Sequence, residues 1–105
     1  INRDRGHVLE NVVYLELRRR GYTVYVGQLT KGEIDFVAQK PGGILEYYQV
    51  SESVLDPATR DRELAPLEAV KDQYPKFLLT MDELYKPHNY NGIQQCNVLD
   101  WLLGM

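Results

Sequence analysis

The sequence predicts an α/β domain with the element order αβββαβ, in which helices flank a mixed sheet. Apolar residues recur at helical spacing near the start of the chain. Three β-branched or aromatic segments then follow, separated by short turns. A second helix-like segment precedes a short apolar strand. At 105 residues, the chain 1–105 has room for one domain with a single core.

The first predicted helix ends at Gly21, a natural left-handed stop. Arg18, Arg19 and Arg20 fill its last turn, where positive charge suits the helix dipole. The start has capping residues at positions 2 and 4, Asn and Asp. The expected core-facing stripe consists of Val8, Leu9, Val12, Val13, Leu15 and Leu17.

The next three elements form a predicted antiparallel meander. The strands span residues 22–28, 33–39 and 44–50, and they are separated by a turn at 30–32 and a Pro-Gly-Gly turn at 41–43. The loop length determines which residues of the second and third strands face each other. A three-residue loop sets Asp35 opposite Gln49, and a loop one residue shorter or longer would shift the pairing by one and set Asp35 diagonal to Gln49.

The second half of the chain predicts a crossover. A helix is expected in the segment 56–75, with Thr59 beginning its cap, Pro66 inside it and Pro75 ending it. A buried strand at 76–82 follows, and a right-handed crossover would place it parallel to the third strand. Residues 84–92 are expected to be a polar loop, followed by a strand at 93–98 and a terminal helical turn.

Composition narrows the class of protein. The net charge of −3 argues against a protein that coats nucleic acid through bulk charge, although a local basic patch stays possible. One cysteine, Cys96, excludes a disulfide framework and a cysteine-rich zinc site, and it favours a reducing, cytoplasmic setting. No apolar run is long enough to span a bilayer, so no membrane partner is expected. The polar first residues contain no signal peptide, and a chain starting at Ile1 is expected to be part of a longer protein.

Asp35 is the residue that most needs an explanation, since a carboxylate is unfavourable at the centre of an apolar strand. The predicted register pairs Phe36 with Tyr48 and Ile34 with Val50 on one face. It pairs Asp35 with Gln49, and Glu33 with Ser51, on the other face. Asp35 is therefore either a hydrogen-bonded sheet residue or part of a metal site.

Oxygen ligands at this spacing suit Mg²⁺ or Mn²⁺, and two carboxylates with a lysine could activate water for phosphodiester attack. This sequence does not supply the complete set of groups for such a site. Gln49 offers an oxygen but no charge, and Ser51 cannot replace an ammonium group.

Several motifs resemble the C-terminal domain, of unassigned function, of prokaryotic AAA-type ATPases. The most specific are G-x-x-L-E-N from Gly6, G-E-I-D-F-V from Gly32, Y-Q-V-S from Tyr48 and V-x-D-W-L-L from Val98. The resemblance covers nearly the whole chain, and that domain is similar to the PD-(D/E)XK nuclease fold. The resemblance therefore implies a restriction-endonuclease-like fold, whose element order is also αβββαβ. It implies an ATP-binding module in the same parent chain.

The resemblance also implies site residues. Glu10 and Asp35 match the acids of a nuclease metal site, while Gln49 and Ser51 stand where that site has an acid and a lysine. Candidate replacements for the missing positive charge are Lys31, Lys71, Arg60 and Arg62. Candidates for nucleic-acid contact are Lys31, Arg60 and Arg62.

Three functions are consistent with these residues. The first is a catalytically degenerate nuclease-like domain that binds DNA or a partner and regulates the ATPase. The second is an active Mg²⁺-dependent DNA nuclease with a relocated lysine. The third is a purely protein-binding domain, which the acidic balance allows.

Overall fold

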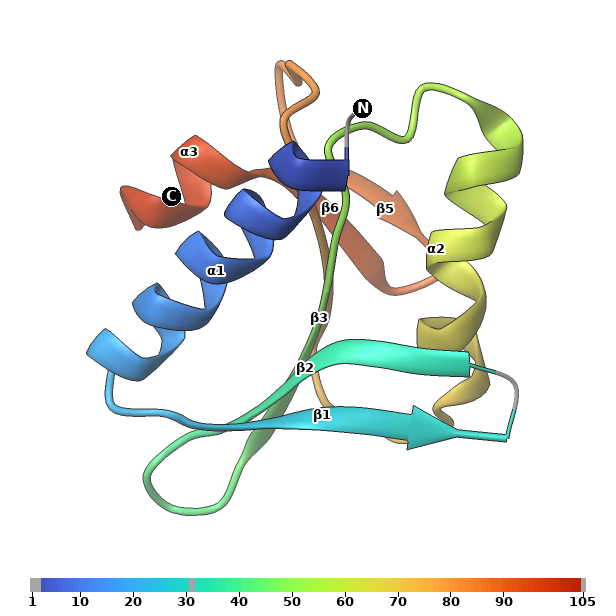
Figure 1. Cartoon of the computed structure of the whole chain (residues 1–105). Coiled ribbons are helices and arrows are strands. Elements are labelled where there is room, and N and C mark those ends of the chain that lie inside the picture. The colour runs from blue at the N-terminus through green and yellow to red at the C-terminus, as the bar shows by residue number, and fades with distance from the viewer. Residues whose placement is uncertain (1–2, 31, 105) are drawn as a thin grey trace.

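The computed structural model describes residues 3–30 and 32–104. It contains a six-stranded mixed sheet with the strand order β1-β2-β3-β4-β6-β5, and helices cover both faces (Figure 1). The α/β class and the flanked mixed sheet are therefore confirmed. The elements are α1 (Arg3–Arg19), β1 (Thr23–Leu29), β2 (Gly32–Gln39), β3 (Leu45–Val50), α2 (Pro57–Ala69), β4 (Lys76–Thr80), β5 (His88–Tyr90), β6 (Ile93–Asn97) and α3 (Val98–Leu102).

The sheet separates two hydrophobic cores. On one face, α1 and α3 cover a core that contains the buried residues Leu17, Tyr48 and Trp101. On the other face, α2 covers a core that contains Leu67 and Leu78. A single sheet buried on both sides accounts for the apolar character of β3 and β4.

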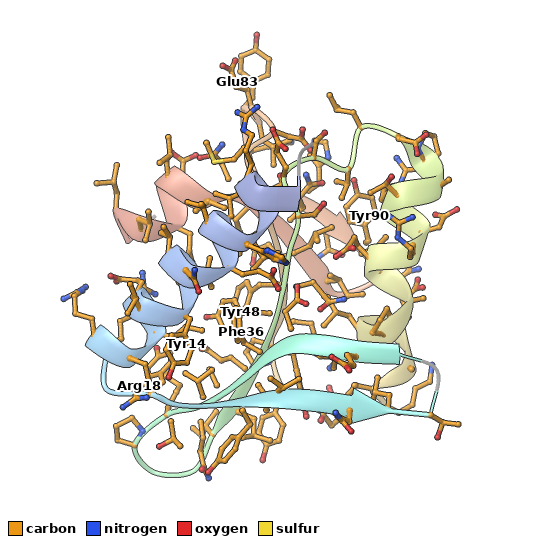
Figure 2. The ribbon with its side chains drawn as sticks, in the orientation of Figure 1. Tyr14, Arg18, Phe36, Tyr48, Glu83 and Tyr90 are labelled. Carbon is orange, nitrogen blue, oxygen red and sulfur yellow. The ribbon has the colours of Figure 1, made fainter. Side chains whose placement is uncertain are left out.

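Aromatic side chains fill much of the core under α1. Tyr14 and Phe36 lie with ring centroids 6.0 Å apart, and Tyr48 stacks on Phe77 at 5.0 Å. Figure 2 shows Tyr14, Phe36 and Tyr48 grouped beside α1. The tyrosine-rich composition therefore serves this core in part.

The pairing confirms the predicted topology. β1, β2 and β3 form an antiparallel meander, and β4 runs parallel to both β3 and β6. The crossover between β3 and β4 is α2, as expected from the strand-helix-strand order. No helix among residues 3–30 and 32–104 is both long and apolar enough to cross a bilayer.

The apolar stripe on α1 is narrower than expected. Val13 and Leu17 are fully buried, but the Val8 and Leu15 side chains are 58% and 64% exposed. The prediction was wrong for Val8 and Leu15. A helix packed on a sheet buries only the side chains that face the sheet, and these two side chains lie beside that buried stripe. The cap predicted at position 4 is also wrong, since α1 already includes residue 4, while position 2 lies outside the described residues.

The start of α2 differs from the prediction by one turn. Asp56 is the N-cap, and its carboxylate accepts hydrogen bonds from the Thr59 amide and hydroxyl at 3.3 and 3.0 Å. Thr59 therefore lies inside the helix. Pro57 occupies the first turn, where its missing amide proton has no cost. Pro66 is buried within the helix, which ends at Ala69 rather than at Pro75.

The predicted loop at 84–92 contains a strand that the sequence analysis missed. Residues 88–90 form β5, which pairs antiparallel with β6. Asn91 and Gly92 connect the two strands, both with positive φ, and Asn89 accepts a hydrogen bond from the Gly92 amide at 2.8 Å. An Asn-Gly pair between strands is a strong hairpin signal. The prediction of a polar loop over 84–92 is therefore wrong for residues 88–90.

An irregularity in the β1–β2 pairing changes which side chains share a face. Tyr25 faces Val37, but Gly27 faces Ile34, so two residues of β2 stand opposite one of β1. Such a bulge breaks the alternation of side chains. Phe36 consequently packs in the core under α1, while Ile34 packs in the core under α2. The prediction that Ile34 and Phe36 share a face is therefore wrong.

Candidate functional site

The bulge places Asp35 where β2 and β3 separate. Regular pairing runs from the turn to Phe36 and Tyr48, as predicted, and then stops. Beyond it, the Asp35 amide donates to Gln49 Oε1 at 2.7 Å, and the Val50 amide donates to Asp35 Oδ2 at 2.8 Å. Side chains thus replace the backbone ladder, and the predicted proximity of Asp35 and Gln49 is confirmed.

Gln49 also joins the sheet to α2. Its side-chain amide donates to the Glu63 carbonyl at 3.1 Å, and the residue is only 4% exposed. One side chain therefore holds β2, β3 and α2 together. Because both its oxygen and its nitrogen are used, a hydrogen-bonding role accounts for a polar residue at this buried position.

A pocket of about 340 Å³ opens above this joint. Acidic groups dominate its charge, and one arginine stands at its wall. The lining residues are Gly32, Glu33, Asp35, Gln49, Arg62, Glu63, Ala65 and Pro66.

The electrostatics of the pocket centre on Asp35. Burial, the largest cause, raises the pKa of its carboxyl to about 7. The hydrogen bond from the Val50 amide opposes this increase, while the negative charges of Glu10, Glu63 and Glu33 add to it. Glu10 from α1 therefore influences the same carboxyl as Glu63 from α2.

Glu63 of α2 is an acid of the pocket that the sequence did not place there. Burial raises the pKa of its carboxyl, Arg62 opposes this shift, and Glu10 adds to it. Its position depends on the packing of α2 against β2 and β3. A sequence shows the helical stripe of α2, but it does not show how far along the sheet the helix lies.

Ser51 does not join the pocket. Its amide donates to the Leu79 carbonyl at 3.0 Å, which extends the parallel pairing with β4. Its hydroxyl donates to the Ser53 carbonyl at 3.1 Å. The expected pairing of Ser51 with Glu33 is therefore wrong, because β3 separates from β2 after Tyr48 while its pairing with β4 continues.

The candidate cations are dispersed. Lys31 lies outside the described residues. Lys71 lines a different pocket, at the C-terminal end of α2. Arg60 lies with its guanidinium carbon 5.9 Å from the centre of the Tyr90 ring in β5. Of the cations that the structure describes, Arg62 alone lines the Asp35 pocket.

The described residues do not fit the Mg²⁺ or Mn²⁺ ion implied by the nuclease resemblance. Within 3–30 and 32–104, no three His, Cys, Asp or Glu side chains are placed to hold one ion. Gln49 Oε1 already accepts the Asp35 amide, and Asp35 Oδ2 accepts the Val50 amide. In the same part of the chain, every buried side-chain nitrogen or oxygen has a hydrogen-bond partner.

Comparison with known proteins yields one informative relative. A protein of Haemophilus influenzae, described as uncharacterized, is 43% identical over 95 residues, or 90% of this chain. The chain spans 22% of the length of that relative. No family model matches the chain, and no solved structure matches it. The resemblance to the ATPase-associated domain therefore stays a prediction.

Proposed function

We propose that this chain is a restriction-endonuclease-like domain that has lost phosphodiester cleavage and binds a protein partner within a longer, prokaryotic ATPase chain. Gln49 is the single observation that carries the proposal. Where an active site would have a charged ligand, this side chain instead ties β2 to α2 through two hydrogen bonds.

Electrostatics favour a protein partner over DNA. The pocket contains Glu33, Asp35 and Glu63, and these acids oppose the approach of phosphate groups. Arg60 is turned toward Tyr90, so the basic residues of α2 do not form one patch. A net charge of −3 adds no general attraction for nucleic acid.

The placement within a longer chain has two supports. The sequence motifs resemble a domain that follows an ATPase module. The matched region also makes up 22% of the H. influenzae relative, which is the proportion expected of one domain among others.

A cleavage assay tests the loss of catalysis. The domain is incubated with plasmid and branched DNA in Mg²⁺ or Mn²⁺, and no cutting is expected. Cutting that disappears in Asp35→Ala but persists in Asp61→Ala, an exposed acid on α2, would contradict the proposal and establish a nuclease. Calorimetry gives an independent measurement, because a heat of Mg²⁺ binding that is lost in Asp35→Asn would also contradict it.

Binding and ATP hydrolysis test the partner. DNA affinity that falls steeply with salt would indicate phosphate contacts and assign the domain to nucleic acid instead. In the longer protein, charge reversal by Glu63→Lys is expected to change the rate of ATP hydrolysis, with Asp61→Lys as the matched control. A longer protein without ATP hydrolysis would refute the ATPase assignment and leave the loss of cleavage standing.

A further inference from the structure

The sheet ends in one long, open edge. β1 is the terminal strand of the sheet and pairs only with β2 among the described elements. Figure 1 shows it as the outermost strand, running along the bottom of the view. The opposite edge is β5, which has only three residues. A short edge strand offers little to pair with, so β1 is the edge at which another strand could be added.

β1 lacks the usual protection of an edge strand. Natural edges carry lysine, proline or inward-pointing charges that block pairing with another chain. The sequence of β1, TVYVGQL, contains neither proline nor any charged residue. Tyr25 and Val26 are 52% and 57% exposed. The extra residue of the bulge belongs to β2, so it does not interrupt β1.

We propose that β1 pairs antiparallel with β1 of a second copy of this chain, so that the two sheets join into one. In a two-fold symmetric pair, the same strand lies on both sides of the axis. A charged strand would face its own charge there, whereas β1 places only uncharged side chains opposite one another. A strand of another protein that is selected by its charge has no charged side chain on β1 with which to pair. The proposal does not depend on the function proposed above.

Sedimentation of matched lysine variants tests the pairing. The wild-type chain is expected to form a dimer as its concentration rises from about 1 µM to about 1 mM. Val26→Lys places like charges near the axis and is expected to raise the dimer Kd at least about tenfold. Leu15→Lys adds the same charge on α1, where the side chain is 64% exposed, and is expected to leave the Kd unchanged.

Hydrogen exchange identifies the contact surface. Amides of residues 23–29 are expected to exchange more slowly as the dimer forms. If Val26→Lys unfolds, Tyr25→Lys replaces it, since Tyr25 is also more than half exposed. A chain that stays monomeric over this range, or a dimer that persists in the β1 variants, would overturn the proposal. Protection confined to another element would do so as well.

Discussion

Asp35 has a structural reason to lie within an apolar strand. Its carboxylate accepts the Val50 amide beyond the last regular pair of β2 and β3. The same position, however, leaves the group half-buried among other acids. One carboxylate therefore contributes a hydrogen bond while it carries an electrostatic cost.

The cost predicts a pH-dependent stability. Burial raises the pKa of Asp35 to about 7 in the folded chain, from an ordinary value of 3.8. Between those values the folded state binds more protons, so the free energy of unfolding falls as pH rises toward 7 and then levels off. Asp35→Asn removes the charge and is expected to stabilise the domain by about 1–3 kcal/mol at pH 8, as urea unfolding would measure.

The same variant should bring little gain at pH 5, where Asp35 is largely protonated in the folded wild type. Asp61→Asn removes an exposed acid of α2 and should leave the pH slope intact. A loss of stability in Asp35→Asn at pH 8 would show that the hydrogen bond from the Val50 amide to the charged carboxylate outweighs the cost of burial and the repulsion by the neighbouring acids.

The sequence predicted part of this site for a clear reason. The Pro-Gly-Gly turn sets the register near the turn, and that register brings Asp35 beside Gln49. The position of Ser51 could not be predicted from the turn. It depends on a hydrogen bond to Leu79, which is distant in sequence. The geometry of a turn is determined by residues that are neighbours in sequence, whereas the separation of two strands depends on tertiary packing.

At the scale of elements, Gly27 permits the close approach of β1 and β2. A Cβ atom there would lie 2.9 Å from Val37 Cγ2 and 3.1 Å from Ile34 Cβ. Both neighbours pack in the core under α2, so neither is free to move away. The bulge was therefore not predictable from strand patterns alone, since the glycine that accommodates it is a common residue in turns as well.

Gly27→Ala is expected to lower the free energy of unfolding by about 1–3 kcal/mol, because the core must shift to accept the added methyl group. Chemical denaturation measures the change. Gly6→Ala in α1 is the matched control: nothing lies within 4 Å of its added Cβ, and a helix prefers alanine by up to about 1 kcal/mol. Equal effects of the two substitutions would refute the steric explanation.

At the scale of the whole molecule, one sheet joins two cores. Leu17 of α1 packs in one core and Leu67 of α2 packs in the other, and neither side chain is exposed. The order of helix-like and strand-like segments predicted a mixed sheet flanked by helices, which is why the fold class could be predicted from the sequence. β5 is hard to recognise in the sequence, because it has three residues, two of them exposed and polar, and it pairs with β6 at the edge of the sheet.

Leu17→Ala and Leu67→Ala are each expected to cost about 2–5 kcal/mol. Since they lie on opposite sides of the sheet, the double variant should show the sum of the two costs to within about 0.5 kcal/mol. Leu55→Ala, at an 80% exposed position, should change stability by less than about 0.5 kcal/mol. Urea unfolding of the four variants and the wild-type chain measures these values. If the cost of the double variant differs strongly from the sum, the two cores share contacts through the sheet.

The hydrogen bonds of Gln49 have a practical consequence. In a metal-dependent site, an ion helps to keep the surrounding elements in place, and a chelator loosens them. Here an amide side chain joins β2 to α2 without any ion. The domain should therefore keep the same shape and the same melting temperature in EDTA as in magnesium-rich buffer.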